Sequence, residues 1–569
     1  YSPSLALAML DALPYMCEYP HGCTEQTLNK FVPLVIVNKV LKDMGLNLED
    51  ISKKTINFDS QQTGSGGASF SRTPRGNYAP VFDKKLFDEM VGGGLKRLEN
   101  MQLSDGGWGW FSGYGEHSYP HTTAVVVHGL ATAKLSGINA NQNVIARGLE
   151  WLRDYQRGEL ERLCKHQFDS GEGCNEKHPD NYKARADETD ALVYMVLAEG
   201  GIVETEMTRI LYRDRNHLKV YGKALFALGL FINGEMEKME MLKRNISQYL
   251  ILDDENQTAY LNLGEGNLWW CWHGSEIEAN AFYLKLLAVT EPKSEISPKL
   301  VKYLLNNRKN ASYWNSTRDT AYCIEAMAEF IKASGEDKPD MNLGIIFDGK
   351  PLRNQKINSD NLFLFDNAIA LKGAELGTGN HKIEFRKDGK GPLYYSGYLT
   401  YFTLEDFIEK AGLEIKVERR YYKLVGAEKQ RSAQDRRGQV VKQNVEKFER
   451  IPIKNYDVLK SGDLIEVELV VESKNDYEYL VFEDMKPAGL ETCEVRSGYS
   501  DNEMNAFVEY RDERVLFYVR SLPRGMHSVS YRMKAEIPGT FSVLPTKGSA
   551  MYAPELKANS DEIKISVED

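Results

Sequence analysis

The sequence predicts a helical region followed by all-β regions. All seven tryptophans precede residue 315, in a part of the chain where Leu, Ala and Met recur at helical spacing. After about residue 340, short runs of Val, Ile, Tyr and Phe are separated by Gly, Pro, Asn and Asp, which is the pattern of strands and turns. We therefore expect one α region and then one or two β regions.

The composition indicates a folded protein and argues against a dedicated nucleic-acid binder. The chain has 569 residues, 42% of them hydrophobic, and a net charge of −11, so packed cores are expected and a dedicated nucleic-acid binder, which would be basic, is not. No apolar run approaches the ~18 residues that a membrane span needs. The chain starts at Tyr1 without a signal peptide. We expect it to be a portion of a longer exported protein, whose leader or membrane anchor would precede Tyr1.

The helical region contains a degenerate repeat. In its fullest copy, a helix tail leads into a Gly/Trp-rich turn, and the next helix opens with a polar residue just before a buried alanine. Copies of the helix start lie at residues 122–126, 187–192, 276–282 and 317–322. Repeated helix pairs indicate a solenoid or a closed ring. We predict a closed α/α toroid over residues 1–338, with an irregular helical domain as the alternative.

The β part divides near Ala411. Residues 339–410 contain a hairpin with an Asp348-Gly349 turn, with further strands expected in short apolar stretches at 362–365, 381–385 and 394–402. Residues 411–569 contain longer alternating segments, which predict a sandwich of immunoglobulin-like size; they lie at 414–419, 464–471, 515–519 and 527–533. The polar segment 426–438 predicts a mobile loop.

One short motif carries chemistry. Cys23 and Gln26 are three residues apart, so they lie on the same side of one helical turn. With Pro20 and Gly22 holding the preceding chain, the thiolate can attack the carboxamide, expel ammonia and leave an intramolecular thioester. Such an activated acyl group survives only where water is excluded, and it acylates a nearby amine or hydroxyl.

The string Pro-His-Gly-Cys-Thr-Glu-Gln, residues 20–26, resembles the thioester signature of the alpha-2-macroglobulin and complement superfamily. The Tyr-Pro-x-Gly lead-in resembles its bacterial branch, in which Leu or Val often stands at the position of Thr24. The resemblance implies a thioester domain that is an α/α toroid over residues 1–338, the C-terminal part of a CUB-like β domain over 339–410, and a receptor-binding, macroglobulin-like sandwich over 411–569.

The resemblance also implies roles for individual residues. Cys23 would supply the thiol, Gln26 the acyl group, and Glu25 a neighbouring polar support. Tyr19, together with Met551 and the adjacent Tyr552, would shield the thioester from water; the alternative is that the last two are ordinary residues of the sandwich. No cofactor and no metal is implied.

Complement-type members use a histidine from a later toroid helix to direct acyl transfer to hydroxyls. The corresponding stretch here, residues 183–188, has no histidine, and the nearest is His178. We therefore expect direct attack by amines, chiefly lysines of target endopeptidases. In this family a protease cleaves a bait region, and the resulting conformational change exposes the thioester. The protein would be a single-use trap rather than an enzyme. Its other partners would be macroglobulin domains of the same chain, and its location the periplasm, cell surface or extracellular space.

Two other functions remain open. The same thioester could label surfaces, as in an opsonin or adhesin. The turn at residues 105–110 resembles turns of terpenoid cyclases and prenyltransferases, which share the toroid, so a toroid enzyme without a thioester is a third candidate. It is weakly supported, because we find no Asp-rich ionisation motif.

The remaining cysteines give a second, weaker signal. Cys164, His166, Cys174 and His178 have ligand types that suit zinc, but their spacing matches no common zinc finger. A Cys164–Cys174 disulfide is the simpler interpretation for an exported protein. Seven cysteines are an odd number, and acylation of Cys23 would leave six.

Overall fold

The computed structural model divides into two compact units: the described residues up to 396 form the helical unit, and those from 397 to 569 form the sandwich unit. It describes residues 1–4, 9, 12–17, 22–46, 83–164, 183–264, 275–309, 313–362, 365–397, 399, 407–434, 440–499, 502–553 and 556–569, without the side chains of residues 14, 17, 164, 427–434 and 440–447.

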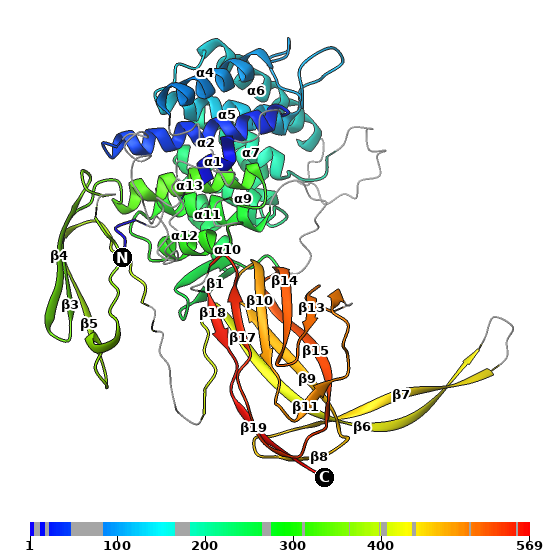
Figure 1. The fold of residues 1–569 in the computed structure, drawn as a ribbon. Helices are drawn as coiled ribbons and strands as arrows, with labels where there is room; N and C mark the ends of the chain where they lie inside the picture. The colour runs from blue at the N-terminus through cyan, green and yellow to red at the C-terminus, as the bar shows by residue number, and fades with distance from the viewer. Residues whose placement is uncertain are drawn as a thin grey trace. The chain divides into compact units, whose positions relative to one another are not determined.

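Six helices of the helical unit, all labelled in Figure 1, form a ring of helix–helix contacts. Each packs against the next, and the last packs against the first; in ring order they are α2 (Thr24–Asp43), α5 (Pro120–Leu135), α7 (Glu188–Glu199), α9 (Val220–Ile232), α11 (Glu276–Thr290) and α13 (Thr317–Ser334). Most residues of each of these helices are buried. In α9, every residue from Val220 to Leu230 is buried, as expected for helices with neighbours on several sides.

The other long helices pack outside this ring. They are amphipathic, with one buried stripe facing the ring; they are α4 (Lys84–Asn100), α6 (Gln142–Cys164), α8 (Thr205–Asp214), α10 (Met236–Ser247) and α12 (Ile296–Asn306). A short helix, α1 (Leu13–Cys17), contacts α2, and a hairpin of β1 (Leu250–Asp253) and β2 (Thr258–Leu261) packs on α12. Within the described ranges, none of the helices is both long enough and apolar enough to span a membrane.

The predicted repeat is confirmed by two tryptophans in matching environments. Trp108 and Trp314 are fully buried. In both, the indole N–H donates to a carbonyl ten residues earlier, in the preceding outer helix, at 2.8 Å. The backbone N–H of each donates to a threonine hydroxyl of the following ring helix, Thr123 at 2.9 Å or Thr320 at 3.1 Å. The same turn therefore joins outer helix to ring helix at two places in the chain.

A three-stranded antiparallel sheet belongs to the helical unit, and several of its residues join the same hydrophobic core. Its strands are β3 (Asp340–Phe347), β4 (Lys350–Asn358) and β5 (Ile383–Lys390). The predicted hairpin turn is confirmed, with φ of 48° at Asp348 and 78° at Gly349. The strand expected at 362–365 is wrong at both described ends, because Leu362 lies in a turn and Phe365 in a bend. Residues 363–364 and most of 398–406 lie outside the described part.

The sandwich unit consists of three sheets around one core. Its strands follow the chain order β6 (Ile415–Gln434), β7 (Val440–Pro452), β8 (Val458–Lys460), β9 (Leu464–Ser473), β10 (Tyr477–Met485), β11 (Leu490–Thr492), β12 (Gly498–Tyr499), β13 (Phe507–Tyr510), β14 (Arg514–Leu522), β15 (Gly525–Ala535), β16 (Gly539–Val543), β17 (Lys547–Ala550), β18 (Lys557–Asn559) and β19 (Ile563–Glu568). The sheet orders are β12-β13-β14-β10-β17-β18, β11-β15-β9-β6-β7 and β16-β19-β8. The four predicted strand segments lie in β6, β9, β14 and β15.

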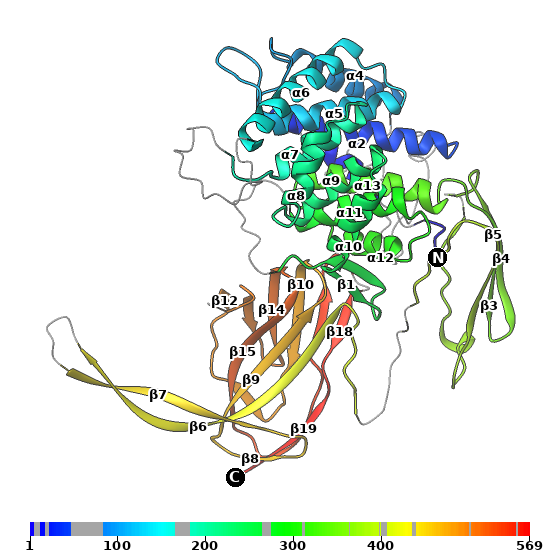
Figure 2. The same cartoon turned by 180° about the vertical axis from the view of Figure 1, so that it is seen from behind.

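The prediction of a loop at 426–438 is wrong over most of its length. β6 continues to Gln434 and pairs with β7 from Tyr422 to that residue. The pairing of β6 with β9 stops at Leu424, so beyond this point the two strands form a ribbon that extends from the sheet (Figure 2). A polar sequence can form such a ribbon because its ladder uses backbone groups. Residues 435–439 lie outside the described part.

Candidate functional site

Cys23 and Gln26 meet at the start of α2. Cys23 precedes the first helical residue with an extended backbone, and Gln26 is the third residue of the helix. The Cys23 N–H donates to Oε1 of Gln26 at 3.3 Å. The Gln26 side chain therefore folds back across the helix start toward the cysteine.

Gly22 makes this geometry possible. A Cβ at this position would lie 2.4 Å from Oε1 and 2.5 Å from Cβ of Gln26. Side-chain Cβ atoms do not approach other non-hydrogen atoms this closely. Only glycine leaves room for the carboxamide to rest against the backbone before the cysteine. The structure thus gives a steric reason for the glycine of the motif.

Thr24 anchors the start of α2, a role that the sequence did not indicate. Its hydroxyl donates to the Gly109 carbonyl at 2.7 Å, and its N–H donates to the Trp110 carbonyl at 2.8 Å. The side chain is fully buried. The Gly/Trp turn therefore accepts both hydrogen bonds from the first residue of α2, and a Leu or Val at this position would lack the hydroxyl bond.

Glu25 forms an ion pair with α13. Its carboxylate lies 3.5 Å from the guanidinium of Arg318, which also pairs with the buried Glu278 of α11. Burial opposes the charge on Arg318, but Glu278 and Glu25 outweigh it and hold its pKa above the usual range. Glu25 thus connects the start of α2 to the starts of two other ring helices.

An open hollow of about 520 Å³ lies over the pair. It is lined by Gly22, Cys23, Gln26, Arg97, Trp110 and Phe111. Nη2 of Arg97, on α4, donates to the Gly22 carbonyl at 2.8 Å. The Cys23 side chain is partly exposed, and Phe111 is 59% exposed. Small nucleophiles can therefore reach the pair from this side within the helical unit.

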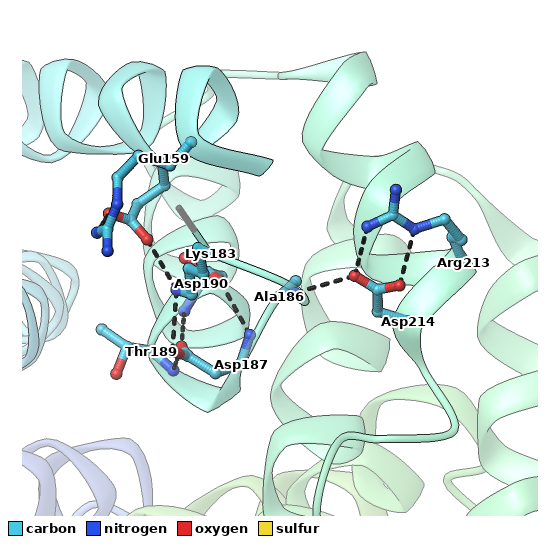
Figure 3. Close-up of polar contacts among 9 residues, drawn as sticks. Glu159, Lys183, Ala186, Asp187, Thr189, Asp190, Arg213 and Asp214 are labelled. Carbon is cyan, nitrogen blue, oxygen red and sulfur yellow. Dashed lines mark hydrogen bonds and ion pairs between the residues drawn. The ribbon is translucent and has the colours of Figure 1, made fainter. Parts of the chain in front are cut away.

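The stretch 183–188 forms an ionic anchor at the start of α7 (Figure 3). Lys183 pairs with Glu159, Asp187 and Asp190 at 2.7, 2.9 and 2.7 Å. Burial and the neighbouring Asp187 raise the pKa of Asp190 to about 6 although Lys183 opposes the shift. The Ala186 N–H donates to Asp214 at 2.9 Å.

Several predicted site residues cannot be placed together. Tyr19, Pro20 and His21 lie outside the described residues. Met551 and Tyr552 are exposed in the sandwich unit, 52% and 76% respectively, where Tyr552 packs edge-on against Tyr479 at 5.3 Å. The shield of Tyr19, Met551 and Tyr552 stays a prediction.

The structure does not test the predicted pairing of Cys164 with Cys174. Residues 165–182, including Cys174, lie outside the described part, and so does the side chain of Cys164. Both the disulfide and the zinc alternative stay open. Elsewhere, in the part of the chain that the structure describes, no group of three or more His, Cys, Asp or Glu side chains is arranged to hold a metal ion.

The sandwich unit identifies the class of protein. Residues 415–555 match the family described as the bacterial alpha-2-macroglobulin MG10 domain. The helical unit precedes it and carries the thioester-type motif at Cys23 and Gln26. By this domain and by the curated relatives below, the chain is similar to bacterial alpha-2-macroglobulins.

Several known proteins are similar to this chain. An alpha-2-macroglobulin of Thermotoga maritima is 26% identical over 319 residues, 56% of this chain and 14% of the relative. An alpha-2-macroglobulin homolog of Nostoc is 24% identical over 490 residues, 84% of this chain and 23% of the relative. The crystal structure of trypsin-activated alpha-2-macroglobulin from Escherichia coli is 19% identical with a TM-score of 0.45, covering 97% of this chain and 32% of that chain. The present chain spans less than a quarter of the length of the two curated relatives.

Proposed function

We propose that this chain carries an internal thioester between Cys23 and Gln26 and is the acylating portion of a covalent trap for endopeptidases. The observation that carries the proposal is the contact between the Cys23 N–H and Oε1 of Gln26 across Gly22. It holds the carboxamide over the residue whose thiol must attack it. Lysine amines of the bound protease are the nucleophiles that we expect.

The proposal includes the domain arrangement. The ring of six helices with its outer layer is the arrangement of an α/α toroid, proposed for residues 1–338. Residues 339–410 are proposed as the C-terminal part of a CUB-like domain, and residues 411–569 as the receptor-binding, macroglobulin-like sandwich. The bait region and further macroglobulin domains would lie elsewhere in the full protein, which we place in the periplasm, at the cell surface or outside the cell.

Amine attack is supported by the ionic anchor at the start of α7. In the stretch where the resemblance places the assisting histidine, Lys183 is surrounded by three carboxylates. Those contacts leave Lys183 protonated, since Asp190 and Asp187 outweigh its burial and raise its pKa above the usual range. A protonated lysine cannot form a reactive acyl intermediate, so the thioester would react with the incoming amine directly.

Intact mass with and without methylamine tests the proposal. A thioester lowers the mass by one ammonia, and methylamine then adds one equivalent; Cys23→Ala removes both effects. A freshly prepared protein with the full sequence mass, a free Cys23 thiol and no methylamine uptake would contradict the thioester. An opsonin or adhesin would keep both mass changes but label surfaces instead of proteases, whereas a toroid enzyme would show neither change.

A further inference from the structure

The peptide group between Gly22 and Cys23 is bonded at both ends. Its carbonyl accepts from Nη2 of Arg97 at 2.8 Å, and its N–H donates to Oε1 of Gln26 at 3.3 Å. The two bonds belong to one resonance-coupled unit. A cation on the carbonyl draws electron density from the nitrogen, so it makes the N–H a stronger donor.

Oε1 of Gln26 is the atom on which negative charge develops. In thioester formation, Sγ of Cys23 attacks Cδ, the C–S bond forms, and charge moves onto Oε1. The C–N bond then breaks, and the nitrogen leaves as ammonia with the thiol proton. In opening, the amine nitrogen bonds to Cδ, the C–S bond breaks, its electron pair goes to sulfur, and one amine proton follows. Both steps pass through an oxyanion on the same oxygen.

A donor aimed at that oxygen lowers both barriers. The Cys23 N–H has the required direction, and it lies at the start of α2, where the helix dipole favours negative charge. The next N–H, that of Thr24, is engaged by the Trp110 carbonyl at 2.8 Å. The Cys23 N–H can donate only to an acceptor, and in the Gln26 carboxamide the acceptor is Oε1. The amide nitrogen of Gln26 takes no part in this contact and is the atom that leaves.

We propose that Arg97 is a positioning residue for acyl transfer between Cys23 and Gln26, acting through the peptide bond that precedes the cysteine. The inference rests on the proposed thioester and adds a residue that the motif does not contain. Arg97 comes from α4, about 75 residues further along the chain. With Phe111 it lines both the hollow over Cys23 and Gln26 and a second, adjoining hollow of about 460 Å³.

The test compares Arg97→Met, Arg97→Lys and Lys96→Met in the full chain. Lys96 neighbours Arg97 on α4 and lines the adjoining hollow, so its replacement removes the same charge from the same helix. Two quantities are measured: the rate of methylamine opening, followed by release of the Cys23 thiol, and the infrared frequency of the thioester carbonyl in protein labelled with ¹³C-glutamine. The frequency reports the strength of the hydrogen bond to Oε1 and does not depend on overall stability.

Arg97→Met is expected to slow opening by about 10-fold, less than the loss of a direct oxyanion donor, and to raise the carbonyl frequency. Arg97→Lys should keep the opening rate and the carbonyl frequency close to those of the unmodified protein. Lys96→Met should change neither the rate nor the frequency. If Arg97→Met forms no thioester or does not fold, restoration of the thioester and of the low carbonyl frequency by Arg97→Lys supports the proposal. A defect shared equally by the Met and Lys variants assigns Arg97 a packing role and overturns it.

The proposal is also overturned if Arg97→Met and Lys96→Met show the same opening rate and the same carbonyl frequency. This outcome differs from failure of the proposed function itself. In that case the unmodified protein takes up no methylamine and shows no thioester carbonyl band at all.

Discussion

The carboxylate of Glu25 lies 3.5 Å from the guanidinium of Arg318, and this ion pair joins the first turn of α2 to the first turn of α13 where the helical ring closes. Arg318 also pairs with Glu278 at the start of α11. The residue beside the candidate thioester is therefore tied to the two helices that complete the ring. The position of Cys23 depends on contacts with segments about 250 to 300 residues away.

Replacing Arg318 should cost more stability than replacing Glu25. Glu278 is 1% exposed, so Arg318→Met leaves a buried carboxylate without its counter-ion, a loss of about 3–5 kcal/mol. Glu25 is 15% exposed, and Glu25→Gln leaves Arg318 its other partner, so about 1 kcal/mol is expected. Urea unfolding followed by tryptophan fluorescence measures both. Equal losses for the two variants would contradict the central role given to Arg318.

Gly22→Ala should strongly slow thioester formation while the fold persists. The added Cβ would lie 2.4 Å from Oε1 of Gln26, so the carboxamide must move away from Cys23, and a displacement of about 1 Å costs on the order of 100-fold in rate. Gly92→Ala is the matched control, because a Cβ there meets nothing within 4 Å and alanine favours the helix by up to about 1 kcal/mol. Methylamine uptake by mass measures the effect; normal uptake by Gly22→Ala would refute the steric argument.

The sequence predicted the features that local chemistry determines. The turn at Asp348 and Gly349 needs positive φ at both positions, which these residue types tolerate. The repeat was visible because ring helices open with a polar residue just before a buried alanine, as at Thr123-Ala124 and Thr320-Ala321. The contact between Cys23 and Gln26 was predictable because two residues three positions apart lie on the same side of a helical turn.

Contacts between distant segments could not be predicted in this way. Arg97 and Arg318 reach the site from other helices, and nothing in their local sequence distinguishes them from surface arginines. The prediction of a loop in the ribbon of β6 and β7 was wrong because it assumed that a polar segment buries too little apolar surface to become ordered. Its ladder depends on the register in which β6 and β7 pair, and residue composition does not encode that register.

Asp484 should be critical for the sandwich unit. The side chain is fully buried and accepts from Arg419, Tyr531 and Thr546, each at 2.8 Å. Asp484→Asn removes the counter-ion of a guanidinium that is 1% exposed, so a loss of about 3–5 kcal/mol is expected.

The matched control for Asp484 is Glu418→Gln on the same strand as Arg419. Glu418 is 48% exposed in its pair with Arg420, and such surface pairs contribute about 0–1 kcal/mol. Hydrogen exchange of peptides from β9 and β10 reports the stability of this unit. Comparable protection in the two variants would contradict a structural role for the buried pair.

His128 should make the stability of the helical ring depend on pH. Its Nδ1 lies 2.6 Å from Glu199 and its Nε2 2.9 Å from Glu325, which also accepts from Lys285. Burial opposes protonation of His128, but the two carboxylates outweigh it and raise its pKa to about 10. The unfolded value is about 6.5, so the stabilisation from His128 is complete below about pH 6.5 and is lost as pH rises through 10.

Unfolding free energies of the unmodified protein and His128→Gln should therefore differ most near pH 6, by about 3–5 kcal/mol, and converge toward pH 10. Comparing the two proteins at each pH cancels the titration of groups that do not interact with His128. All seven tryptophans precede residue 315, so their fluorescence reports on this part of the chain. A difference that stays constant between pH 6 and pH 10 would mean that the imidazole contributes through packing alone, and that its proton is not held by Glu199 and Glu325.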